Sequence, residues 1–187
     1  SIIIVIVAFL LPGMVKNKNQ QQSKKIMPWV ISIVAIVGAV YGFIIFSRQG
    51  GQERPGQAIS TQGEQHIAVG ATHPAYNSNP PTSGWHYATP ADWGVHADEL
   101  PDEQILHNLE HGGVWISYKG IDEATKLELE KIGSSNSKII VTPRLANDAP
   151  IALVSWGRLQ KLEQFDATII MNFIRANKNK TPEPFAN

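Results

Sequence analysis

The chain has 187 residues, enough for one domain of ordinary size with additional sequence before it. Sixteen basic and sixteen acidic residues cancel, but residues 1–25 hold four lysines and no acid, so the remainder is acidic. This acidic remainder argues against a nucleic-acid-binding protein. The absence of cysteine excludes disulfides, thiolate metal sites and cysteine nucleophiles.

Residues 26–46 form an uncharged and strongly apolar run. As a helix they would extend for about 30 Å, which matches the hydrocarbon core of a bilayer. We therefore predict a transmembrane helix over residues 26–46, with the lipid bilayer as a partner. Four lysines precede this run and only two arginines follow it closely, so the positive-inside rule places the residues after it on the extracytoplasmic side of the cell membrane.

Residues 1–25 combine a short apolar stretch with a basic cytoplasmic tail. The apolar stretch, residues 1–13, is too short to cross a bilayer and lacks the charged start and cleavage site of a signal peptide. Two interpretations stay open. The stretch belongs to a first membrane helix of a two-pass protein, or it lies upstream of a true start at Met14. We favour the second because it gives a single-pass layout.

A polar segment and a long loop follow the apolar run. Residues 47–65 are rich in glycine and glutamine, which predicts a flexible linker before an extracytoplasmic domain over residues 66–187. Residues 66–98 show no regular periodicity, and YNSNPPTSGWHY within them is turn-forming sequence. Its aromatic residues must pack on the domain, and long ordered loops often carry function.

The rest of the chain alternates between helical and strand patterns. Capping residues, acidic first turns and terminal glycines predict helices at 101–111, 122–132 and 166–177. Short apolar runs predict strands at 113–118, 138–142, 151–156 and 158–162. This order predicts an α+β domain with a small mixed sheet. It also matches a thioredoxin-like core without cysteines, in which Pro150 would occupy the position of the cis-proline of that fold.

Six histidines lie within residues 66–111 and none elsewhere. His107 and His111 stand four residues apart on the first predicted helix, so they share a face and can hold one metal ion. Glu110 borders that face, and HNLEH fits the inverted zincin pattern, in which the glutamate activates a zinc-bound water. Two glycines follow at once and end the helix too early for a zincin, so we favour another kind of metal site. A purely structural role at the helix end is the alternative.

The turn-forming loop offers further ligands. His86 closes PPTSGWH and is the best third ligand, and His73 is the next. Three imidazoles without a thiolate suit zinc, copper(II) or nickel rather than calcium or magnesium. For any single histidine, a hydrogen bond to the backbone is the competing interpretation. We predict a metal site of His86, His107 and His111, with Glu110 and His73 as further or supporting ligands.

Three segments resemble the domain-of-unknown-function family 3105. They are YNSNPPTSGWH, WGVHADELPDEQILHNLEHGGVWISY and VTPRLANDAPIALVSWGRLQKLEQFD, within a resemblance that runs from about residue 60 to the end. The family usually has proline where Trp85 stands and tyrosine where His96 stands, which makes His96 a poor candidate for a shared site. Its members commonly carry a basic tail and one membrane helix. The resemblance implies that PPTSG…H and HNLEHGG form one site, but it implies no reaction.

The sequence therefore predicts a membrane-anchored extracytoplasmic domain with a histidine-based site for a transition metal, zinc or copper, and favours metal binding over an enzyme. Two alternatives stay open. A non-catalytic accessory subunit would contact other membrane proteins through the small residues Gly38 and Gly42 and through the long aromatic loop. A metal-dependent hydrolase would use Glu110 as its base.

Overall fold

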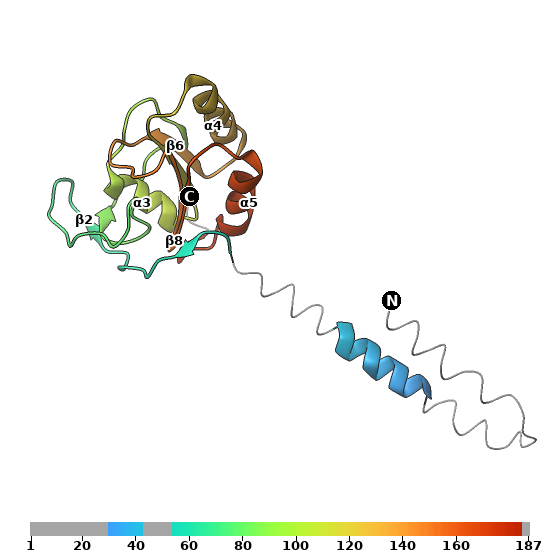
Figure 1. Cartoon of the computed structure of the whole chain (residues 1–187). Helices are drawn as coiled ribbons and strands as arrows, with labels where there is room; N and C mark the ends of the chain where they lie inside the picture. The colour runs from blue at the N-terminus through green and yellow to red at the C-terminus, as the bar shows by residue number, and fades with distance from the viewer. Residues whose placement is uncertain (1–29, 43–53, 185–187) are drawn as a thin grey trace, which may run out of the picture. The chain divides into compact units, whose positions relative to one another are not determined.

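The computed structural model describes residues 30–42 and 54–184 of the chain (Figure 1). The chain divides into two units, Ser1–Gln52 and Glu53–Asn187. In the first unit, residues 30–42 form a helix with exposed side chains. The predictions for residues 1–25, including the start at Met14, lie outside the described residues.

The predicted transmembrane helix over residues 26–46 is not borne out by the helix that the structure describes. Over residues 30–42 and 54–184, no helix has both the length and the apolar character needed to cross a membrane. The remaining residues of the predicted helix, 26–29 and 43–46, lie outside the described residues.

A six-stranded mixed sheet forms the centre of the second unit. In spatial order its strands are β1 (Gln57–Ala58), β8 (Arg158–Leu162), β7 (Ile151–Ser155), β5 (Val114–Tyr118), β6 (Ile139–Pro143) and β4 (Gly94–Val95). Strands β5, β6 and β4 are parallel, and the pairs β5–β7, β7–β8 and β8–β1 are antiparallel. A second sheet pairs β2 (His66–Ile67) with β3 (His86–Tyr87) in parallel.

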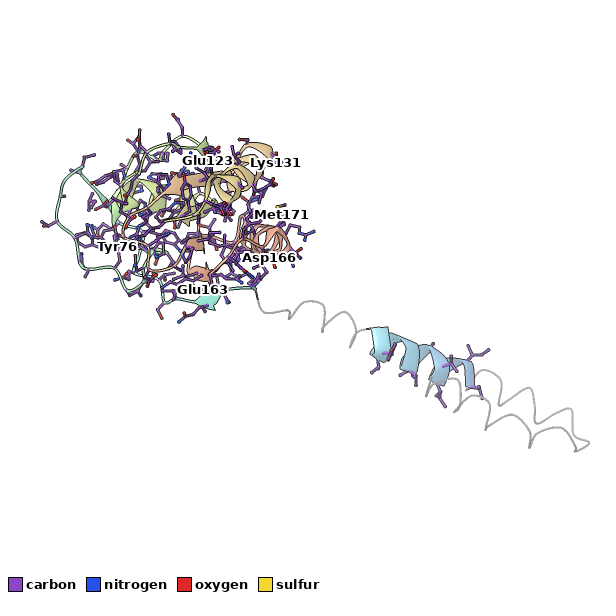
Figure 2. The ribbon with its side chains drawn as sticks, turned by 45° about the horizontal axis from the view of Figure 1, so that its top comes forward. Tyr76, Glu123, Lys131, Glu163, Asp166 and Met171 are labelled. Atoms are coloured by element: carbon purple, nitrogen blue, oxygen red, sulfur yellow. The ribbon has the colours of Figure 1, made fainter. Side chains whose placement is uncertain are left out.

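Helices cover both faces of the six-stranded sheet (Figure 1). Helix α3 (Asp102–Glu110) lies on one face, and α4 (Glu123–Ser135) and α5 (Ala167–Asn177) lie on the other. The side chains of β5 divide accordingly, because Val114 and Ile116 pack with α4 and α5 whereas Trp115 packs with α3. Figure 2 shows Met171 on α5 and, on the opposite side of the domain, Tyr76 of the long loop. The central strands are buried on both faces, which explains their continuous apolar sequences.

Two of the predicted helix starts are confirmed by their caps. The side chain of Asp122 accepts a hydrogen bond from the Thr125 N–H at the start of α4, and the side chain of Asp166 accepts one from the Ile169 N–H at the start of α5. These bonds satisfy N–H groups that the first turn leaves without a helical partner. The bonds from Thr125 also hold the pKa of the Asp122 carboxyl below its usual value.

The prediction of a small, thioredoxin-like sheet was wrong, although the mixed α+β arrangement is present. Short strands β1 and β4 extend the sheet at both edges. The cis peptide bond found in the described residues is Asn79–Pro80, in the long loop, and not the bond before Pro150. Strands of two residues carry no periodic pattern, so the sequence did not reveal the edges of the sheet.

Residues 54–65, which the sequence assigned to a flexible linker, pack on the domain. The Ile59 N–H donates to the Gly157 carbonyl at 3.0 Å, next to the pairing of β1 with β8. The Gln62 N–H donates to Ser83 Oγ, also at 3.0 Å. The packed domain therefore begins before the predicted boundary at residue 66, and its first residues support the loop that carries His86.

Candidate metal centre

Three histidines and one glutamate converge where α3 meets the two-stranded sheet. His66 comes from β2, His86 from β3, and His107 and Glu110 from α3. Each offers one ligand atom, and these four atoms all lie within 4.8 Å of one another. His86, His107 and Glu110 are buried and His66 is exposed, so the group reaches solvent at His66.

Two local arrangements bring these side chains together. In the second sheet His66 is the register partner of His86, so the parallel pairing places the two residues side by side on neighbouring strands. On α3, His107 and Glu110 are three residues apart and therefore lie on one face. The rings confirm the contact, because the centroid of His86 lies 4.9 Å from that of His66 and 5.2 Å from that of His107. A sheet of two strands with two residues each, together with one turn of α3, thus builds the whole group.

Backbone carbonyls fix the orientation of the two buried imidazoles. His86 Nδ1 lies 2.7 Å from the Gly84 oxygen, and His107 Nδ1 lies 2.7 Å from the Tyr87 oxygen. A carbonyl oxygen can only accept, so both Nδ1 atoms carry a proton. In the neutral imidazole each Nε2 then keeps its lone pair. Metal-bound histidines are usually held in this way, with the second ring nitrogen donating to a carbonyl or a carboxylate.

Glu110 is a buried carboxylate surrounded by imidazoles. Its side chain is 3% exposed, and Oε2 lies 3.1 Å from His86 Nε2 and 3.6 Å from His66 Nε2. Within residues 54–184, no lysine or arginine forms an ion pair with it. A buried carboxylate without compensation is unfavourable, so its charge needs a protonated histidine or a bound cation.

Burial disfavours the charged form of the His107 imidazole, so His107 is poorly suited to be the cation that compensates Glu110. Desolvation lowers its pKa below the usual value, and the neighbouring histidines lower it further, against the opposing effect of the bond to the Tyr87 carbonyl. A lowered pKa keeps the imidazole neutral near neutral pH, and the neutral imidazole is the form that binds metal ions. The His66 ring stacks on it with a centroid distance of 4.9 Å.

His111 lies at the edge of this group. Its Nε2 is 3.1 Å from His107 Nε2 and 3.6 Å from Glu183 Oε2. Together with Glu110 and Glu183 it forms a second group whose ligand atoms lie within 4.8 Å of one another. The predicted i, i+4 pair is thus in contact through its Nε2 atoms.

Among the predicted ligands, His73 lies elsewhere. Its Nδ1 donates to the Pro74 carbonyl at 2.8 Å, and its Nε2 lies 3.1 Å from Glu103 Oε1. The sequence interpretation also missed two residues. His66 lies at the predicted start of the domain and belongs to no sequence motif. The one feature of the sequence that pointed to it was its place among the six histidines of residues 66–111. Glu183 lies after the last predicted helix, 166–177, in a segment for which the sequence predicted no element.

Comparison with known proteins gives one match. A family model described as "Protein of unknown function (DUF3105)" matches residues 69–187. These residues include β3, α3 and the C-terminal segment, and therefore every residue of the two ligand groups except His66. No curated protein and no solved structure matches the chain.

Proposed function

We propose that this chain, which belongs to the DUF3105 family of proteins of unknown function, binds a divalent transition-metal ion through His86, His107, Glu110 and His66. The family match confirms the resemblance found in the sequence and supplies no activity. The proposal therefore rests on the site. The observation that carries it is the pair of Nδ1–H bonds to backbone carbonyls, which directs the Nε2 atoms of His86 and His107 toward a shared buried position beside Glu110.

The distances suit a single ion. Two ligand atoms bound at about 2.0–2.1 Å to a tetrahedral zinc ion lie about 3.3 Å apart. The Glu110 Oε2 atom lies 3.1 Å from His86 Nε2 and 3.6 Å from His66 Nε2. Three imidazoles and one carboxylate favour zinc, and also accept copper(II), over calcium or magnesium. A bound divalent ion would also compensate the buried charge of Glu110.

The composition of the site favours binding over catalysis. Four protein ligands complete a tetrahedral zinc shell, whereas catalytic zinc sites usually keep one position for water. Glu110 points toward His66 and His86 and is itself a ligand in this arrangement, so it is not free to act as a base. His66, with a side chain that is 50% exposed, gives an ion a route to the site from solvent.

The test is the metal content of the purified full chain. After incubation with zinc and exhaustive dialysis, elemental analysis is expected to find bound zinc in the native chain. The double variant His86→Ala/His107→Ala is expected to lose the zinc. The single variant His73→Ala is the matched control and is expected to retain it. Equal zinc in the native chain and the double variant, with both folded by circular dichroism, would refute the proposal.

A further inference from the structure

The chain after α5 crosses the C-terminal end of α3. The Asn179 N–H donates to the Gly112 carbonyl at 2.9 Å, and the Glu183 N–H donates to the Glu110 carbonyl at 3.3 Å. The Thr181 hydroxyl also donates to the Glu110 carbonyl. The last turn of a helix leaves carbonyl groups without helical partners, and this segment satisfies one of them at Glu110. Residues 179–184, the C-terminal strap, are thereby fixed beside the candidate metal centre.

Two features outside the strap hold it close. Gly112 has a φ of +86°, and a Cβ atom there would lie 2.7 Å from Asn179 Oδ1 and 2.9 Å from Asn179 Cα. Only glycine accepts both that backbone conformation and that approach. On the other side, Lys138 Nζ donates to the His111 carbonyl at 2.9 Å and to the Pro184 carbonyl at 3.1 Å. The strap is therefore joined to the same turn that presents His111.

This arrangement places the Glu183 carboxylate beside His111. Glu183 Oε2 lies 3.6 Å from His111 Nε2, and with Glu110 the two residues form a group of ligand atoms within 4.8 Å of one another. The side chain of His111 is 12% exposed and that of Glu183 is 58% exposed. The group therefore opens to solvent on the Glu183 side. It shares only Glu110 with the first group.

We infer that Glu110, His111 and Glu183 form a second divalent-cation site, which shares Glu110 with the first. The inference rests on the proposed function, because Glu110 is a ligand of the first site. A carboxylate has two oxygens and can give one to each of two ions, as in paired metal sites about 3.5–4 Å apart. The Nε2 atoms of His107 and His111, 3.1 Å apart, would then serve different ions.

The donor set of the second site differs from that of the first. Two carboxylates and one imidazole form a harder set of ligands, which accepts manganese(II) as well as zinc. Three protein ligands also leave a coordination position for water, whereas four complete the first site. We therefore expect the second ion to bind more weakly than the first and to exchange with solvent through the exposed side of Glu183.

Zinc titration of the metal-free full chain by isothermal calorimetry tests this inference. The native chain is expected to bind two zinc ions in two phases. Glu183→Gln keeps the size and backbone contacts of the residue. Loss of a residue that only supports a metal ligand weakens metal binding by up to about 100-fold. Because Glu183 would be a ligand itself, its replacement is expected to weaken the second phase by at least about 100-fold. The first phase is expected to change by less than about threefold. Glu128→Gln, on the exposed face of α4, is the matched control and is expected to keep both phases.

The outcomes separate the two proposals. One zinc ion per chain in both the native protein and Glu183→Gln, with equal affinity, would overturn the second site and leave the first intact. A single phase that His107→Ala and His111→Ala weaken equally would also overturn it, because the two histidines would then share one ion. No zinc binding by the native chain would overturn both sites.

Discussion

Two histidine–glutamate pairs in this domain have almost the same local geometry and different surroundings. In His73–Glu103 and in His86–Glu110, Nδ1–H donates to a backbone carbonyl and Nε2 lies 3.1 Å from a carboxylate oxygen. The side chains of the first pair are 16% and 23% exposed, and those of the second are 0% and 3% exposed. The pair geometry alone therefore does not identify a metal site.

The neighbours of each pair make the difference. Around His73, the bond to the Pro74 carbonyl and the interaction with Glu103 together outweigh desolvation and raise its pKa. Around His86, two further imidazoles share the carboxylate, and one of them, His107, has a lowered pKa. Three imidazoles and one buried carboxylate lie close enough to hold a metal ion, whereas His73 faces a single carboxylate.

The strongest test of this comparison replaces the two carboxylates by amides. Glu110→Gln is expected to reduce zinc affinity by about 1000-fold, or about 4 kcal/mol, because it removes an anionic ligand and the charge that attracts the ion. Glu103→Gln, at the pair of the same geometry, is expected to change zinc affinity by less than about twofold. Competition with a chromophoric zinc chelator measures both values. Similar losses in the two variants would contradict the distinction drawn between the pairs.

A second test concerns Gly112, in the turn that follows Glu110 of the buried His86–Glu110 pair. Gly112→Ala is expected to lower the free energy of unfolding by about 3 kcal/mol, because it combines a positive φ with a clash against Asn179. Gly63→Ala is the matched control. It has the same φ of +86° with no atom within 4 Å of the added Cβ, and is expected to cost about 1 kcal/mol. Urea denaturation of both variants measures the difference, and equal losses would show that the strap does not press on Gly112.

The smallest expected effect is the pH dependence of the partly buried His73–Glu103 pair. The pKa of His73 is raised in the folded chain, so its contribution to stability is fully present below the unfolded pKa, about 6.5, and is lost as pH rises through the higher folded pKa. Relative to His73→Gln, the native chain is expected to lose less than about 1 kcal/mol of stability from pH 6 to pH 8. Urea denaturation at both pH values measures this. A difference that grows with pH would reverse the assigned direction.

The sequence predicted those parts of the site that depend on local spacing. His107 and Glu110 share a helical face because of their separation along α3, and this was readable from HNLEHGG. His86 was found through the composition of its loop. His66 was not found, because it reaches the site through parallel pairing with a strand twenty residues away, and two-residue strands leave no pattern.

The same division holds for the fold. The strands β5, β6 and β7 were predictable because burial on both faces requires apolar residues at nearly every position. The edge strands β1 and β4 were not, since each has only two residues and so short a run carries no periodic pattern. Glu183 was not predictable either, because backbone hydrogen bonds of the C-terminal strap, rather than a sequence pattern, bring it to His111. The predicted location outside the cytoplasm stays a prediction.

The parallel pairing of His66 with His86 has a consequence for how the long loop is held. The ligands of the proposed first ion are spread over residues 66–110, so the site does not exist in the unfolded chain, and metal binding becomes part of the folding free energy. In a chain without cysteine, the ion would do what a disulfide does elsewhere and cross-link an irregular loop to a helix. Metal removal would then loosen residues 66–87 before it disturbed the six-stranded sheet, and hydrogen exchange would detect this as lost protection confined to that loop.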